Sequence, residues 1–183
     1  MTGSGERNGV LDRLRGAFPD AVVADGGDCA DPWVQVRPES VRDAIRFLRD
    51  ADDLAFDFLM CITGMDLSGL QEAPDLRVVY HLYSYRHRQA ITVRADVPRE
   101  SPVVPSIVGL YPIANWHERE AFDLLGLRFD GHPDLTRILL PPEWEGHPLR
   151  RDWKEGPTCL GFPTGREDRL SRMRAEAKSG EGT

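Results

Sequence analysis

The sequence predicts an α+β protein: a mixed or antiparallel sheet packed by helices, followed by an extended, proline-rich C-terminal arm. An amphipathic helical pattern precedes three segments rich in β-branched and aromatic residues, which together predict a sheet with helices. After residue 127, six prolines interrupt any regular periodicity. We therefore expect an α+β domain (residues 1–127), an extended arm (128–165) and a charged tail (166–183).

The first elements are short. Asn8 is predicted to cap a helix whose apolar residues, from Val10 to Phe18, recur at roughly helical spacing. Two short strands are expected at Ala21–Ala24 and Trp33–Val36, on either side of a polar loop.

The clearest helical pattern follows these strands. Val41, Ala44, Ile45 and Leu48 are spaced at i, i+3, i+4 and i+7, after Ser40 as the cap. We expect this face of the helix to be buried.

Three longer strands are predicted next, at Asp57–Thr63, Leu76–Ser84 and Gln89–Val97, from their β-branched and aromatic residues. The middle one carries apolar side chains on both faces, which is typical of a central strand. Residues Arg86–Arg88 form the predicted tip of a hairpin. An antiparallel sheet with helices on one side is the simplest arrangement.

The pattern changes after Pro98. A short helix is predicted over Val104–Leu110, and a second over Trp116–Leu125. Asn115, followed three residues later by Glu118, has the pattern of a capping box at the start of the second helix. Gly126 is predicted to end it as a glycine C-cap.

The predicted arm is too apolar for a solvated linker, because it contains Trp144, Trp153, Leu139, Leu140 and Phe162. We expect these side chains to be covered by the domain or by a partner.

Composition excludes several classes of protein. A net charge of −7 argues against nucleic-acid binding through phosphate neutralisation. No apolar stretch is long enough to span a bilayer, and the first eight residues do not resemble a secretory signal. The three cysteines are widely spaced and form no Cys-x-x-Cys pair, so they predict reduced thiols with no local ligand set for zinc or an iron–sulfur cluster. Neither a nucleotide-binding glycine motif nor a nucleophile elbow is present.

One alternative is a metal-dependent hydrolase. It would use His117, His132 and His147 as ligands, with Glu118 or Glu120 as the base. The spacing does not support it, because no second histidine follows His117 at the position that two ligands on one helix face require.

Two of these histidines sit in identical Gly-His-Pro triplets, at residues 131–133 and 146–148. Glycine permits unusual backbone angles and proline keeps the preceding residue extended, so each histidine is expected at a rigid bend. We favour a structural role, in which the ring bonds backbone groups, over catalysis.

The predicted helix over Trp116–Leu125 also carries a cluster of charges. They form either a solvated face or an interface, the latter pairing with arginines of the arm or with a neighbour. The helix residues are Glu118, Arg119, Glu120 and Asp123, and the arm candidates are Arg137, Arg150 and Arg151.

Two blocks of sequence resemble the signature of the C-subunit family of NADH-quinone oxidoreductase. The first runs from Glu118 to Gly126 and continues through Phe129, Gly131–Leu135 and Arg137–Leu139, and the second is Gly146–Asp152. Thr136 stands where the family often has a basic residue. The resemblance is close over residues 116–153 and general before that.

The resemblance implies a subunit without its own active site, cofactor or metal, in the peripheral arm of the proton-pumping NADH-quinone oxidoreductase (complex I), on the cytoplasmic side of the cell membrane. FMN and the iron–sulfur clusters are then expected in partner subunits, and this chain packs against the quinone-reducing D subunit, near the B subunit. The residues expected at these interfaces are Glu118, Arg119, Glu120, Asp123, His132, Asp134, Arg137, Trp144, His147, Arg150, Arg151, Asp152 and Trp153. An equivalent scaffold in a membrane-bound hydrogenase or a ferredoxin-fed complex is the alternative, because sequence does not name the electron donor.

Overall fold

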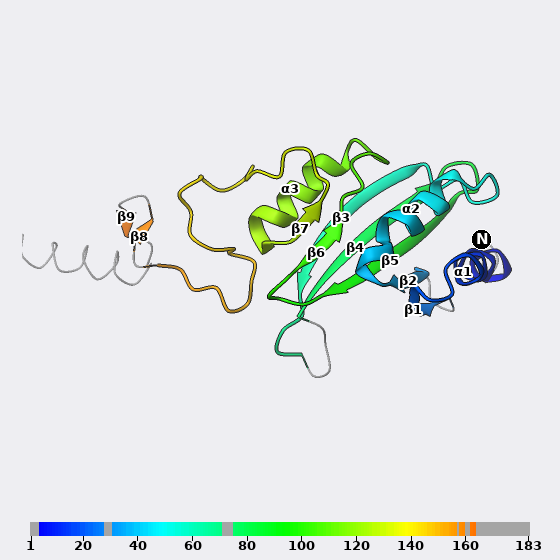
Figure 1. The fold of residues 1–183 in the computed structure, drawn as a ribbon, viewed down its shortest axis with the longest axis horizontal. Helices are drawn as coiled ribbons and strands as arrows, with labels where there is room; N and C mark the ends of the chain where they lie inside the picture. Colours follow the sequence, from blue (N-terminus) through cyan, green and yellow to red (C-terminus); the bar gives the residue numbers. More distant parts are fainter. Residues whose placement is uncertain (1–3, 28–30, 71–74, 157, 160–161, 164–183) are drawn as a thin grey trace, which may run out of the picture.

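The computed structural model describes residues 4–27, 31–70, 75–156, 158–159 and 162–163 (Figure 1). Its core is a five-stranded mixed sheet of order β1-β2-β5-β4-β3. The strands are β1 (Val22–Gly26), β2 (Trp33–Val36), β3 (Phe58–Asp66), β4 (Leu76–Ser84) and β5 (Gln89–Val97). β2 pairs with β5 in parallel and the other pairs are antiparallel. Of the two predicted arrangements the mixed sheet is therefore correct, and the fully antiparallel one is wrong.

The predicted bounds of β4 and β5 are confirmed, and a turn at residues 85–88 joins them as a hairpin. β4 lies between β5 and β3, as expected of a strand that is apolar on both faces. The side chains on one face of β4, from Leu76 to Ser84, are fully buried, whereas most on the other face are half-buried, so a slip of one residue would exchange the two faces.

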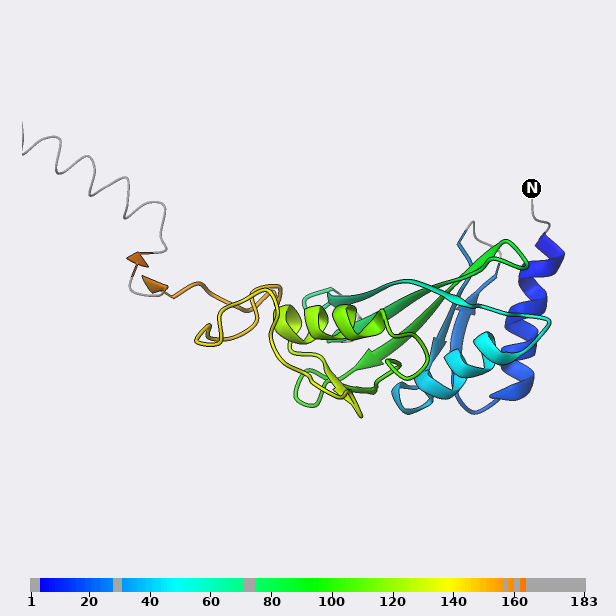
Figure 2. The same cartoon turned by 90° about the horizontal axis from the view of Figure 1, so that it is seen from above.

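Among the described residues, three helices flank the sheet: α1 (Ser4–Ala17), α2 (Val41–Asp50) and α3 (Ala114–Leu125). Figure 2 shows α2 and α3 on the same side of the sheet. The predicted face of α2 is buried, and all four of its apolar residues are fully covered. A short 3-10 turn, η1 (Pro38–Ser40), precedes α2, and the Ser40 side chain makes no capping hydrogen bond.

The prediction that Asn8 caps the first helix is wrong, because α1 begins at Ser4 and Asn8 lies inside it. The residues before Asn8 include no proline to stop the helix, and an asparagine inside a helix costs little.

The predicted helix over Val104–Leu110 is also wrong. Val103–Pro105 form strand β6, which pairs in parallel with β7 (Arg128–Asp130), and a turn follows at residues 108–110. Val104 precedes a proline, which disfavours helical backbone at that residue. A short apolar run does not by itself distinguish a strand from a helix.

Helix α3 approaches β3 closely at Gly64. A Cβ atom there would lie 2.5 Å from a methyl carbon of Leu125 and 2.7 Å from one of Leu127. Because Gly64 has no positive φ angle, a side chain here would be opposed by this packing and not by the backbone conformation.

The predicted arm begins with strand β7, whose Phe129 belongs to the buried core. The extended part follows it, and from here "the arm" means residues 131–156. Figure 1 shows the arm looping past the C-terminal end of α3. Beyond it, β8 (Thr158–Cys159) and β9 (Phe162–Pro163) form a two-stranded ladder. None of the helices in the described ranges is long and apolar enough to cross a membrane.

Candidate functional site

The candidate site is the junction between helix α3 and the arm, where most of the predicted residues lie. Its centre is the fully buried carboxylate of Asp123. One oxygen accepts the backbone N–H groups of Ile138, Leu139 and Leu140 at 3.0, 2.7 and 3.0 Å. The other accepts Nη1 of Arg137 at 2.8 Å. The pairing of Asp123 with Arg137, one of the predicted alternatives, is confirmed.

The electrostatics of Asp123 favour the charged form. Burial by itself raises the pKa of this carboxyl, but the three backbone N–H groups and Arg137 outweigh burial and hold its pKa below the usual range. A buried charge with this many donors fixes the start of the arm rigidly.

The arm also satisfies the last carbonyls of α3, which no residue within the helix can bond. The Nδ1 atom of His147 donates to the carbonyl of Asp123 at 3.0 Å. The N–H of Leu149 donates to the carbonyl of Leu124 at 3.0 Å, and Nε of Arg150 donates to the carbonyl of Leu125 at 2.7 Å. The helix itself ends as predicted at a left-handed Gly126, with φ of +72°.

His147 therefore takes the structural role that its Gly-His-Pro triplet predicts. The preceding Gly146 has φ of +79°, and the ring bonds a backbone carbonyl. Burial lowers the pKa of His147, and the nearby charges of Arg150 and Arg137 lower it further, while the bond to Asp123 opposes them. The neutral ring is the stable form at neutral pH.

The far end of the arm is anchored to the sheet through Asp66, at the end of β3. Its nearly covered carboxylate accepts Ser68 N–H at 3.0 Å, Ser68 Oγ at 2.6 Å, Arg99 Nη2 at 2.7 Å and Arg151 N–H at 2.9 Å. Arg99 also bonds Asp152 of the arm at 2.8 Å. These donors outweigh the effect of burial and hold the pKa of Asp66 far below its usual range.

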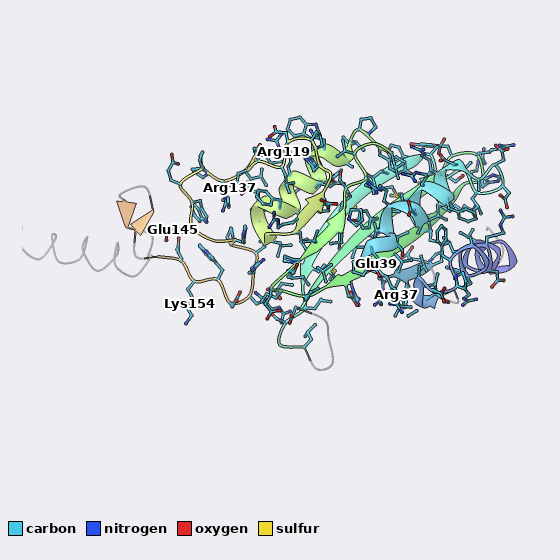
Figure 3. The ribbon with its side chains drawn as sticks, in the orientation of Figure 1. Arg37, Glu39, Arg119, Arg137, Glu145 and Lys154 are labelled. Carbon is cyan, nitrogen blue, oxygen red and sulfur yellow. The ribbon has the colours of Figure 1, made fainter. Side chains whose placement is uncertain are left out.

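The arm also packs against itself. Trp144 and Trp153 stack with ring centroids 5.9 Å apart, and Trp153 donates to the carbonyl of Glu145 at 3.1 Å. Arg137 donates to the carbonyl of Gly146 at 3.0 Å, and Figure 3 shows Arg137 and Glu145 on this loop. The expectation that something covers the two tryptophans is met in part by the arm itself, since both are half-buried.

The predicted capping box at Asn115 and Glu118 is wrong, because α3 begins at Ala114 without a side-chain cap. Glu118 is instead fully buried and accepts Ser106 Oγ and the Ile107 N–H, both at 2.7 Å. Burial raises the pKa of Glu118 to about 7, although both hydrogen bonds oppose this. The helix spacing put Glu118 on the inner side of α3, where desolvation dominates.

Other groups surround Glu118 in the interior. His132 Nε2 lies 4.0 Å from its carboxylate, and His132 Nδ1 accepts the Asp134 N–H at 3.0 Å. Burial lowers the pKa of His132. Tyr80 is fully buried, and burial together with the charge of Glu118 raises its pKa.

The remaining predicted residues lie on the surface of the junction. Arg119, labelled in Figure 3, donates to the carbonyl of Thr136 at 3.1 Å and to the Thr136 hydroxyl at 2.9 Å. Its guanidinium also lies over the ring of Trp116. Thr136 thus contributes a contact despite the absence of a basic residue there. Glu120 is exposed and makes no ion pair with any described residue.

The metal-hydrolase alternative finds no support in this geometry. Within the described ranges, no three histidine, cysteine, aspartate or glutamate side chains are grouped as a metal ion requires. His132 and His147 each use one ring nitrogen on backbone groups.

Sequence reasoning missed the partners that other elements bring to the junction: Asp66, Ser68, Arg99 and Ser106. No local pattern marks them, because their partners lie far away in the sequence: Arg99 is 33 residues from Asp66, Arg151 is 85 residues from it, and Ser106 is 12 residues from Glu118.

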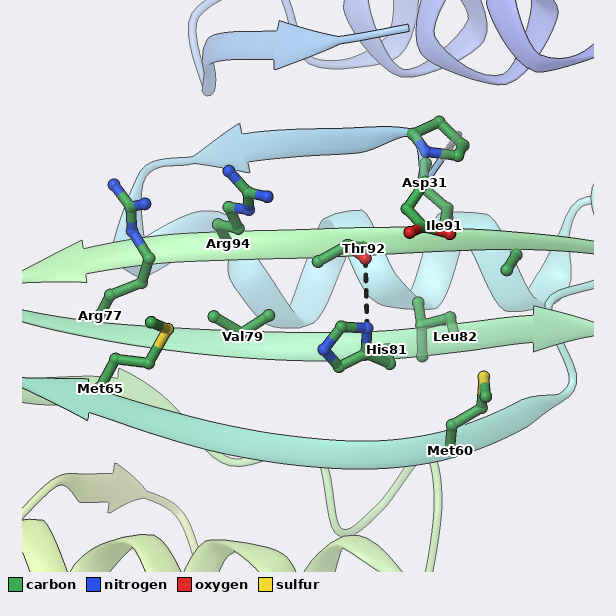
Figure 4. Close-up of a pocket in the computed structure, with 12 residues that line it drawn as sticks. Asp31, Met60, Met65, Arg77, Val79, His81, Leu82, Ile91, Thr92 and Arg94 are labelled. Carbon is green, nitrogen blue, oxygen red and sulfur yellow. Dashed lines mark hydrogen bonds between the residues drawn. The ribbon is translucent and has the colours of Figure 1, made fainter. Parts of the chain in front are cut away.

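A hollow of about 540 Å³ lies on the sheet face opposite α2 (Figure 4). Met60, Met65 and Val79 line it together with Arg77, and His81 shares a 3.2 Å hydrogen bond with Thr92 across its floor. None of the predicted site residues lies there.

Comparisons with known proteins match the chain over most of its length. Residues 34–158 match the family described as the 30 kDa subunit of respiratory-chain NADH dehydrogenase. The C subunit of the NADH-quinone oxidoreductase of Roseiflexus sp. (strain RS-1) is 46% identical over 169 residues, which cover 92% of this chain and 95% of that protein. The corresponding C subunit of Herpetosiphon aurantiacus is 35% identical over 173 residues, which cover 94% of this chain and 98% of that protein.

Two solved structures share the fold. A trypsin-resistant fragment (1–134) of Nqo5 has a TM-score of 0.60 at 29% identity, covering 71% of this chain and 99% of the fragment. A chain of the membrane-bound sulfane sulfur reductase, an archaeal respiratory membrane complex, has a TM-score of 0.67 at 20% identity, with 91% of each chain covered. The second likeness concerns the fold alone.

Proposed function

The chain belongs to the family of the 30 kDa subunit of respiratory-chain NADH dehydrogenase, and on that premise we propose that it is a structural subunit of the proton-pumping NADH-quinone oxidoreductase. It carries no active site or cofactor of its own in this proposal. It supports electron transfer from NADH to quinone by holding the quinone-reducing D subunit, near the B subunit, on the cytoplasmic side of the membrane. FMN and the iron–sulfur clusters belong to the partner subunits.

One observation carries the structural part of this proposal: residues that carry the family resemblance are used to hold the arm on the domain. Asp123 binds three backbone N–H groups of the arm, and His147 and Arg150 bind the last carbonyls of α3. These bonds give the side chains a structural role, which supports a scaffold subunit.

The arm is well suited to bind a partner. It is anchored at two places, residues 137–140 and Arg151, by the buried or nearly buried carboxylates of Asp123 and Asp66, so little conformational freedom is lost when a second protein binds. Leu139 and Leu149 are nevertheless each 58% exposed, and the stacked rings of Trp144 and Trp153 belong to the same arm. Rigid aromatic and aliphatic groups of this kind commonly dominate interfaces.

The test is affinity purification of the full-length tagged chain from its native membranes, with mass spectrometry of the recovered proteins and iron analysis of the isolated chain. We expect recovery with the D and B subunits and with a flavin-bearing, NADH-binding protein, and no iron on the chain alone. Recovery with hydrogenase subunits would indicate that the chain is a scaffold subunit of a hydrogenase-type complex. Recovery as a lone protein with a stoichiometric metal would overturn the proposal.

A further inference from the structure

The outward face of α3 carries an apolar stripe that the fold leaves uncovered. Ile113, immediately before α3, and Trp116 are 50% and 56% exposed, and Leu124 further along the helix is half-buried. Positions 3, 7 and 11 residues apart lie on one side of a helix, so these residues and Glu120 share a face. Single exposed apolar residues are ordinary, but a stripe of them is typical of an interaction site.

The stripe ends in a small apolar pocket between α3 and the edge strand β3. Its volume is about 100 Å³, and Ile62, Ala121 and Leu124 line it with the exposed Leu149 of the arm. A cavity of about 150 Å³ holds a benzene molecule, so this pocket has room for one aliphatic side chain.

Glu120 is the one acidic group among the described residues that line this pocket. It makes no ion pair with a described residue, whereas its neighbour Arg119 is bonded to Thr136 and lies over Trp116. A single unpaired carboxylate within an apolar stripe complements a single cation on the partner.

We propose that this α3 face, formed by Ile113, Trp116, Glu120, Leu124 and Leu149, is the docking surface for an apolar segment of another subunit. That segment places one aliphatic side chain in the pocket and a lysine or arginine beside Glu120. The inference rests on the proposed function and specifies which face of the chain the partner covers.

Two other occupants fit less well. In a symmetric dimer through this face, Glu120 would meet a copy of the same surface, and the residues that form this surface include no basic side chain to pair with it. Residues 164–183 of this chain contain Leu170 and Met173 as their only large apolar side chains, among charged and small residues. That is too little apolar surface to cover the stripe.

The experiment uses the complex in its native membranes. Trp116 is replaced by a photo-crosslinking phenylalanine derivative to identify the covering segment. In parallel, partner recovery is compared for Glu120→Lys and for Glu39→Lys, which makes the same charge change at an exposed position on η1 (Figure 3). Ile113→Ser is matched by Val23→Ser, since Val23 is similarly exposed on β1.

We expect the crosslink to lie on another subunit, in an apolar segment with a basic residue. Glu120→Lys should lower recovery of that protein about tenfold, with an unchanged melting temperature of the isolated chain, and both control variants should behave as wild type. Reversing the charge of the partner's basic residue should restore recovery of the Glu120→Lys variant.

A crosslink to residues 164–183 or to a second copy would overturn the inference. So would wild-type recovery of partners by both Glu120→Lys and Ile113→Ser. If the wild-type chain itself recovers no partner protein, the proposed function is wrong and this inference fails with it. If the wild-type chain recovers its partners and the variants do too, this inference alone is wrong.

Discussion

Replacing Glu118 by glutamine should change how the stability of the protein depends on pH. Glu118 is fully buried beneath α3, where it accepts Ser106 Oγ and the Ile107 N–H. A glutamine of nearly the same shape can still accept the Ile107 N–H through its carbonyl and can donate to Ser106 Oγ. The substitution therefore removes the titrating group and preserves most of the packing.

The magnitude follows from the pKa. Burial raises the pKa of Glu118 from 4.5 to about 7. Because the folded state holds the proton more tightly than the unfolded chain, the stabilisation is fully present below pH 4.5 and is lost as the pH rises to about 7. Each pKa unit is worth about 1.4 kcal/mol. The free energy of unfolding should therefore fall by about 3 kcal/mol through Glu118 alone, and Glu118→Gln should not show this loss.

The assay is urea unfolding of the full-length chain, followed by tryptophan fluorescence at several pH values from about 4.5 to 8. The difference between Glu118→Gln and wild type is the informative quantity, since the lowered pKa values of His132 and His147 act in the opposite direction in both proteins. That difference should shift in favour of the variant by about 3 kcal/mol across this range. The exposed Glu39→Gln serves as the control. A difference that stays constant with pH would refute the reasoning, because Glu118 would then titrate alike in the folded and unfolded states.

Three further substitutions test the arm and the packing of α3. Asp123→Asn removes the charge that binds the arm and should weaken this anchor by about 2 kcal/mol. Hydrogen exchange of the amides at residues 138–140 should then become roughly 30-fold faster, while exchange in the sheet stays the same. Unchanged exchange at residues 138–140 would contradict the anchor. Gly126→Ala forces a side chain into φ of +72° and to 2.6 Å from an imidazole carbon of the arm, so we expect a loss of roughly 1–3 kcal/mol and a melting temperature at least about 3 °C lower by calorimetry. Gly64→Ala should cost about 1–3 kcal/mol in the same assay, because its Cβ would lie 2.5 Å from a leucine methyl of α3. Gly109→Ala meets no atom within 4 Å and is the control for both glycines; an equal effect there would contradict the steric explanation.

The predictions that succeeded depend on contacts close in sequence. The strands β4 and β5, the spacing of Val41 to Leu48 and the C-cap at Gly126 each follow from residue preferences and backbone geometry over a few residues. The rigid bend at His147 likewise follows from its two neighbours in the chain. In each case the local preference and the tertiary structure agree.

The predictions that failed concern residues whose partners come from elsewhere. Asn115 and Glu118 have the spacing of a capping box, but Glu118 turns inward to Ser106 and Ile107, because β6 brings two donors to the buried side of α3. Val104 lies in a strand because β7, more than 20 residues later, supplies its hydrogen-bonding partner. Neither contact is visible in a local window.

The α+β class, the central hairpin of the sheet and the C-terminal end of α3 could all be predicted from the order of residues. The family could be predicted as well, from two blocks of unusual composition that lie close together in the chain. The parallel pairing of β2 with β5, the burial of Glu118 and Asp123, and the anchoring of the arm at Asp123 and Asp66 became visible in the folded protein alone. The physical reason is that periodicity and turn chemistry act over a few residues. Desolvation and the pairing of buried charges depend instead on groups that meet only after the chain has folded.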